Sequence, residues 1–186
     1  MKKTMMAGAL TLLGAAASMP ALAHPAGAMA AAGFEAGLIH PFTGIDHLLA
    51  MLAVGIWSVR QPRGHKLPPV FLAAMLAGAL SGVAGLAIPG LETGIAVTVA
   101  LIGCLIALAA RLPAAVSVSM IALCAALHGN AHGHELPQVA SAAGFLAASA
   151  VLMLAGRWFG RVATAGLVRL AGAGIAATGV LLVALN

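Results

Sequence analysis

The chain has 186 residues, of which 62% are hydrophobic and only 7% are charged. A soluble domain usually carries about 25% charged residues to cover its surface, so this composition excludes a soluble protein and indicates an all-α integral membrane protein. The net charge of +5 does not indicate a nucleic-acid partner, because the basic residues stand singly or in short clusters between apolar runs.

The N-terminus has the pattern of a secretory signal peptide. Residues 1–23 begin with two lysines, continue as an apolar run and end on Ala21-Leu22-Ala23. A small-residue ending of this kind is typical of a cleavage site, although an uncleaved first span is the alternative. Cleavage would make His24 the new N-terminus, outside the cytoplasm, where its amine and imidazole could chelate a metal.

The rest of the chain, residues 24–186, is predicted to form one transmembrane domain. A spanning helix needs about 20 mostly apolar residues. Turn residues such as Pro89-Gly90 and Gly156-Arg157 separate the apolar runs. The predicted spans are six: 38–59, 70–88, 93–110, 114–132, 139–156 and 163–184.

The basic residues predict the orientation of these spans. Cytoplasmic loops of membrane proteins are enriched in Lys and Arg. With the mature N-terminus outside, every basic residue of the mature chain falls in or beside a cytoplasmic loop: Arg60, Arg63, Lys66, Arg111, Arg157, Arg161 and Arg169. We therefore expect a multi-pass protein of the bacterial inner membrane, with both mature termini on the outer side.

The first span opens on His40-Pro-Phe-Thr-Gly-Ile-Asp46-His47. Pro41 suits the first turn of a helix. His40 and His47, two helical turns apart, share a face, with Gly44 leaving space between them. In a span that starts near Leu38, His47 lies roughly 14 Å into the membrane, close to its middle. Asp46 could ligate a metal or hold an imidazole in the right tautomer, and ionisable groups at such depth are functional candidates by default.

The end of the fourth span carries a second polar cluster, His128-Gly-Asn-Ala-His132-Gly-His134-Glu135. His128 and His132 are one turn apart, and Glu135 continues the same face. Gly129 and Gly133 would keep the surroundings uncrowded. His134 is either a further ligand or an exposed loop histidine.

Together the two clusters predict a site for a divalent transition metal. Imidazole and carboxylate suit nickel, cobalt, zinc or copper(II), without a choice among them. The clusters occupy corresponding positions in two opposed three-helix halves, which suggests the inverted repeats common in secondary transporters. Glu35, Glu92 and Glu135 lie in outer segments and could capture ions.

The motifs His40-x5-Asp46-His47 and His128-Gly-x-x-His132-Gly-x-Glu135 resemble the two signatures of the HupE/UreJ family. These small membrane proteins are associated with nickel supply to hydrogenase and urease. The resemblance covers essentially the whole chain, although Leu127 stands where the family often has Phe. It implies uptake of nickel, or next cobalt, and metal-handling roles for His40, Asp46, His47, His132 and Glu135, with Glu92 joining by its position.

The sequence therefore favours a metal permease that is not an enzyme and holds no permanent cofactor. The alternatives are a membrane metal sensor or metallochaperone that binds without transporting, and an intramembrane metalloenzyme. We expect the lipid bilayer and the ion as partners and no nucleic acid, while a homo-oligomer and cytoplasmic metallochaperones stay open.

Overall fold

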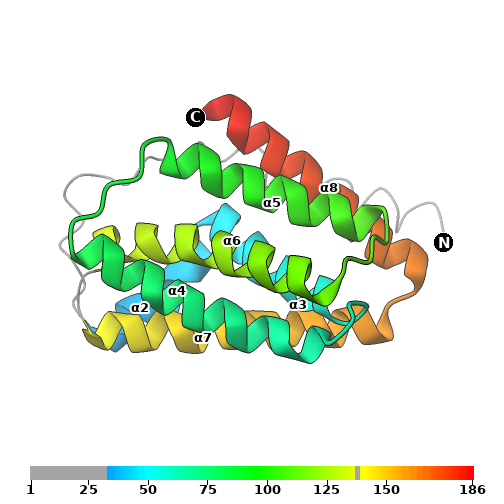
Figure 1. Ribbon diagram of the computed structural model, residues 1–186, viewed down its shortest axis with the longest axis horizontal. Helices are drawn as coiled ribbons and strands as arrows, with labels where there is room; N and C mark the ends of the chain where they lie inside the picture. Colours follow the sequence, from blue (N-terminus) through cyan, green and yellow to red (C-terminus); the bar gives the residue numbers. More distant parts are fainter. Residues whose placement is uncertain (1–32, 137–138) are drawn as a thin grey trace, which may run out of the picture. The chain divides into compact units, whose positions relative to one another are not determined.

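The computed structural model describes residues 33–136 and 139–186, so the predicted signal peptide and His24 lie outside the described residues. Within the described part the chain is helical and has no strand (Figure 1). The elements are α2 (Phe34–Thr43), α3 (Ile45–Ser58), the 3-10 turn η1 (Gly64–Lys66), α4 (Leu67–Val83), α5 (Leu91–Ala107), α6 (Ala114–Glu135), α7 (Val139–Val162) and α8 (Ala165–Leu185).

The helices are those of a multi-pass membrane protein. Four are long and apolar enough to cross a membrane: Gly64–Val83, α6, α7 and α8. The bent pair of α2 and α3 makes a fifth if the two count as one span, and α5 is apolar but shorter. Each predicted span falls on one of these elements, while the count of six crossings stays a prediction.

The first predicted span is not a straight helix, so that part of the prediction is wrong. It breaks at Gly44, whose backbone is extended (φ −98°, ψ 116°), and α2 and α3 meet at 86°. Pro41 lies inside α2 near its end, not in a first turn. The straight-helix depth of His47 therefore does not apply, because His47 lies in the first turn of α3.

The predicted break at Gly156-Arg157 is also absent. Helix α7 continues through both residues to Val162. Gly156 is instead a contact point, because a Cβ there would collide with the Leu52 carbonyl of α3. A glycine inside an apolar run signals a turn or a close helix contact equally well, and here it is the contact.

Helices α4 and α6 pack backbone against backbone (Figure 1). A Cβ on Gly78 would collide with the carbonyl of Ala126, and one on Gly129 with that of Met75. Gly133 faces Ala79 in the same way. The glycines of the second polar cluster thus let α6 approach α4, rather than only leaving space around the histidines.

The glycine contacts also fix the directions of the helices. Gly78 faces Ala126 and Gly82 faces Asn130, so α4 and α6 run parallel. Helices α3 and α7 are likewise parallel, since Gly55 meets Met153 and Gly160 approaches Ile56 and Val59 further along both. Helices α5 and α8 are antiparallel, because Gly103 meets Ala176 while Gly179 meets Ala100. These directions are those of a chain that reverses at every connection from the first predicted span to the sixth.

The two ends of the bundle differ in charge. We call one the histidine end, because α3 begins and α6 ends there with the predicted metal residues. The other is the basic end, where the guanidinium of Arg157 donates to the Ser58 hydroxyl at 2.7 Å and that of Arg169 donates to the Ala107 carbonyl at 2.9 Å. The basic residues predicted to lie on the cytoplasmic side fall in or beside the connections at this end, which join α3 to α4, α5 to α6 and α7 to α8.

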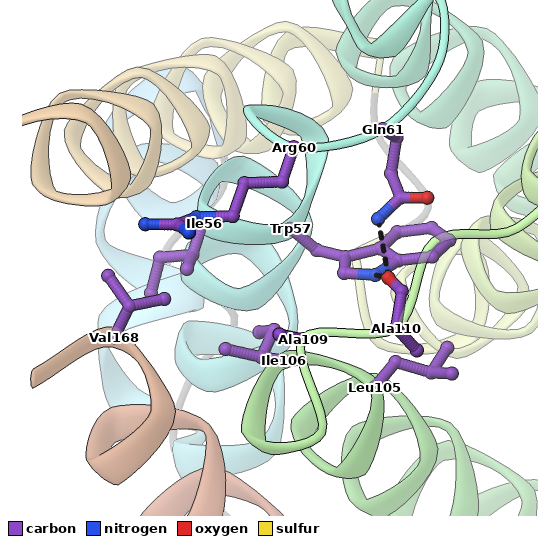
Figure 2. A pocket seen from close by; sticks show the side chains of 9 residues that line it. All are labelled: Ile56, Trp57, Arg60, Gln61, Leu105, Ile106, Ala109, Ala110 and Val168. Carbon is purple, nitrogen blue, oxygen red and sulfur yellow. Dashed lines mark hydrogen bonds between the residues drawn. The ribbon is translucent and has the colours of Figure 1, made fainter. Parts of the chain in front are cut away.

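At the basic end, α3 is tied to the loop between α5 and α6 (Figure 2). The Gln61 side-chain amide donates to the Ala110 carbonyl at 2.8 Å and accepts from the Leu112 N–H at 3.0 Å. The Trp57 indole N–H donates to the same Ala110 carbonyl at 3.2 Å. These bonds pair the Ala110 carbonyl and the Leu112 N–H, two loop groups that lie outside any helical hydrogen-bond pattern. They thereby hold the basic end together.

The close approach of α4 and α6 predicts opposite effects for two Gly→Ala substitutions. Alanine favours a helix over glycine by about 1 kcal/mol, but overpacking costs about 1–3 kcal/mol. Gly78→Ala should therefore lower the apparent unfolding midpoint of the detergent-solubilised protein. Gly174→Ala on α8, where a Cβ meets nothing within 4 Å, should leave the midpoint unchanged or raise it. Equal effects would contradict the packing described.

Candidate metal centre

Three histidines and a carboxylate converge at the histidine end. His40 comes from α2, His47 from α3, and His132 and Glu135 from α6. One donor atom from each lies within 4.8 Å of all the others. His40 Nε2–H donates to Glu135 Oε2 at 2.8 Å, which joins two residues 95 positions apart. We call these four residues the four-donor cluster.

The bend at Gly44 sets the position of His47. Asp46 Oδ1 accepts from the backbone N–H of His47 at 2.8 Å and from its Nδ1–H at 2.9 Å. A Cβ on Gly44 would lie 2.9 Å from that same oxygen, so glycine makes room for the contact. Because a carboxylate only accepts, Nδ1 carries the proton, and in the neutral imidazole Nε2 keeps its lone pair.

This contact bears on the two roles predicted for Asp46. A carboxylate that holds the second nitrogen of a ligating imidazole fixes its tautomer and orientation. His47 Nε2 is buried and has no hydrogen-bond partner among the described residues. The geometry therefore favours Asp46 as the orienting partner of His47 over Asp46 as a ligand.

His132 is held by stacking rather than by hydrogen bonds. Its ring is fully buried and stacks on Phe145 of α7, with ring centres 4.5 Å apart and planes 12° from parallel. Neither ring nitrogen has a hydrogen-bond partner within residues 33–136 and 139–186. Buried polar groups are nearly always paired, so a buried imidazole with two open nitrogens needs an explanation, and a bound ion would supply one.

The spacing of the cluster fits a first-row metal ion. Ligands on opposite sides of an ion with bonds of about 2.1 Å lie about 4.2 Å apart, so only a small contraction would close the cluster around an ion. The ring centre of His132 is 5.0 Å from that of His40 and 4.5 Å from that of His47. Two imidazoles on one ion have ring centres about 4.5–5.2 Å apart at the usual angles.

Three other predicted site residues, His128, Glu92 and His134, are not part of the four-donor cluster. His128 is fully buried, and its ring centre is 5.3 Å from that of His47. Glu92 is in the first turn of α5. The exposed His134 bonds through Nε2 to the Leu86 carbonyl at 3.1 Å, in the connection between α4 and α5. Asn130 donates to the same carbonyl at 3.0 Å, so this face of α6 anchors that connection.

Phe145 is the contributor that the sequence did not reveal. It is one aromatic residue within an apolar span, and its spacing from either histidine motif is not periodic. Only the packing of α7 against α2 and α3 brings it to His132.

The fold and the cluster define a multi-pass helical membrane protein with imidazole and carboxylate groups gathered between its helices. The sequence matches the family described as HupE / UreJ protein over residues 10–182. It is 42% identical over 150 residues to Protein HupE of Rhizobium leguminosarum bv. viciae, covering 76% of this chain and 78% of that protein. The chain belongs to the HupE/UreJ family, and no solved structure matches it.

The contact between Asp46 and His47 predicts a graded loss of metal affinity. Removing an orienting partner typically weakens metal binding by about 10–100-fold. We expect a loss in this range for Asp46→Ala, and a smaller one for Asp46→Asn, which keeps an oxygen for the same bonds. Titration calorimetry with Ni²⁺ on detergent-purified protein measures both.

His65→Ala is the control for this series, since it removes an exposed histidine of η1 at the basic end. Its affinity should match that of the wild type. An Asp46→Ala variant with unchanged affinity would show that the carboxylate does not orient His47.

Proposed function

We propose that the protein is a permease for a divalent transition metal, with nickel the first candidate and cobalt the next. The observation that supports this most is the four-donor cluster, in which His47 and His132 are buried and His40 and Glu135 partly buried, between helices of a membrane protein of the HupE/UreJ family. The ion is cargo rather than a resident cofactor. Its ligands in this proposal are His40, His47, His132 and Glu135.

The donor set supports a first-row transition ion. Imidazole nitrogen suits nickel, cobalt, zinc and copper, whereas magnesium and calcium prefer oxygen ligands. The cluster has no thiolate, which would hold such ions tightly. A mixed set of nitrogen and oxygen ligands permits the exchange that transport requires, and within this group the family favours nickel.

The helix directions and the charges support uptake into the cytoplasm. The two halves of the chain are α3, α4, α5 and α6, α7, α8, taken in corresponding order. Exchanging them turns the parallel pair of α3 with α7 into the parallel pair of α6 with α4, and it leaves the antiparallel pair of α5 with α8 unchanged. Two inverted three-helix halves, with six crossings, would have this pattern. The basic end would face the cytoplasm by the charge rule, and the histidine end would face outward.

The metal would supply the assembly of an enzyme such as hydrogenase or urease. This part of the proposal rests on the family and on the name of the Rhizobium protein. A membrane sensor or metallochaperone that binds the ion without moving it is the competing function, and accumulation in vesicles separates the two.

Proteoliposomes containing the wild-type protein should accumulate radiolabelled nickel. His47→Ala and His132→Ala should reduce accumulation to the level of empty vesicles, because each removes a ligand. Excess cobalt should compete and excess magnesium should not, given the ligand preferences of these ions.

His65→Ala is the matched control, since it removes an exposed histidine of η1 at the basic end. It should transport like the wild type. Nickel binding by the purified wild-type protein without accumulation would reject the permease in favour of a sensor.

A further inference from the structure

His128 is a buried histidine next to the four-donor cluster, on the side away from the histidine end, and one of its ring nitrogens is free to bind a ligand. It lies one helical turn before His132 on α6, about 6 Å further from the histidine end. Its Nδ1 contacts the Cys124 carbonyl at 2.8 Å, and because a carbonyl only accepts, Nδ1 carries the proton. In the neutral ring Nε2 then keeps its lone pair, and it has no hydrogen-bond partner within the described part of the chain.

His47 presents a matching open nitrogen. Asp46 holds its Nδ1–H, and its buried Nε2 likewise has no partner among the described residues. The ring centres of His47 and His128 are 5.3 Å apart, with planes at 80°. This separation is close to the roughly 4.5–5.2 Å expected for two imidazoles on one ion.

His47 lies between two groups of ligands. Its ring centre is 4.5 Å from that of His132 and 5.3 Å from that of His128. His128 is outside the four-donor cluster, and its other ring contact is Phe71, at 6.2 Å between centres. The pair of His47 and His128 therefore offers two imidazoles with fixed tautomers, whereas the four-donor cluster also includes the Glu135 carboxylate.

We propose that His47 and His128 form a second metal station, to which the ion passes from the four-donor cluster while His47 stays bound. This inference rests on the proposed function and adds its first internal step. The ion exchanges the ligands His40, His132 and Glu135 for His128, and the oxidation state of the metal does not change. With fewer protein ligands and no carboxylate in contact, the second station binds the ion less tightly and releases it toward the basic end.

The variant that tests this step is His128→Asn in the full-length protein. The asparagine amide can still donate to the Cys124 carbonyl, but it has no group in place of Nε2. Nickel uptake by proteoliposomes should fall by at least about tenfold, the lower end of what the loss of a metal partner costs. The nickel affinity of the purified protein should stay near that of the wild type, because the four-donor cluster is intact.

Two results would overturn the proposal. One is uptake by His128→Asn at the wild-type rate. The other is an affinity weakened as much as in His132→Ala, which would make His128 a ligand of the same site. If His128→Asn lowers the unfolding midpoint, His128→Leu, which fills the apolar space, replaces it in the same pair of measurements.

A second arm does not depend on transport. The triple variant His40→Ala/His132→Ala/Glu135→Ala should retain weak nickel binding through His47 and His128. Adding His128→Asn should abolish this binding, although the same change barely alters the affinity of the intact protein. An equal effect in both backgrounds contradicts a second station, whereas wild-type vesicles that accumulate no nickel reject the permease alone.

Discussion

The candidate metal centre depends on the break in the helix between α2 and α3. At Gly44 the backbone leaves the helical conformation, and the two helices meet at 86°. The break places His40 and His47 in different helices, yet their ring centres lie 5.9 Å apart. It also starts α3 two residues before His47, where Asp46 can hold both the backbone N–H and the ring N–H of that histidine.

The glycine contacts give this arrangement its rigid support. Gly37 of α2 packs against the Ser141 carbonyl, and Gly144 of α7 packs against the Phe34 carbonyl in return. The same contact of α2 with α7 places Phe145 near His132. In lipid, where apolar burial does little to drive helices together, such backbone contacts carry much of the association. The polar cluster thus gains fixed positions from small residues outside it.

The helical spacing predicted for His128, His132 and Glu135 is confirmed, because that prediction needed only local geometry. The helix continues through the whole motif, so His128, His132 and Glu135 keep the spacing of one face. The prediction that His40 and His47 share a face assumed a straight helix, and that assumption is wrong, although the two side chains do meet. Pro41 and Gly44 were the visible signals of the break. Phe145 and the contact role of Gly156 could not be predicted, because both depend on which helices become neighbours.

The most direct test of the four-donor cluster as the metal site is X-ray absorption at the nickel edge of the nickel-loaded protein. Nickel bound to His40, His47, His132 and Glu135 should show a shell of nitrogen and oxygen at about 2.0–2.1 Å with the scattering of three imidazoles, one of which is lost in His132→Ala. A shell that contains sulfur, or one without imidazole scattering, would contradict the centre formed by His40, His47, His132 and Glu135.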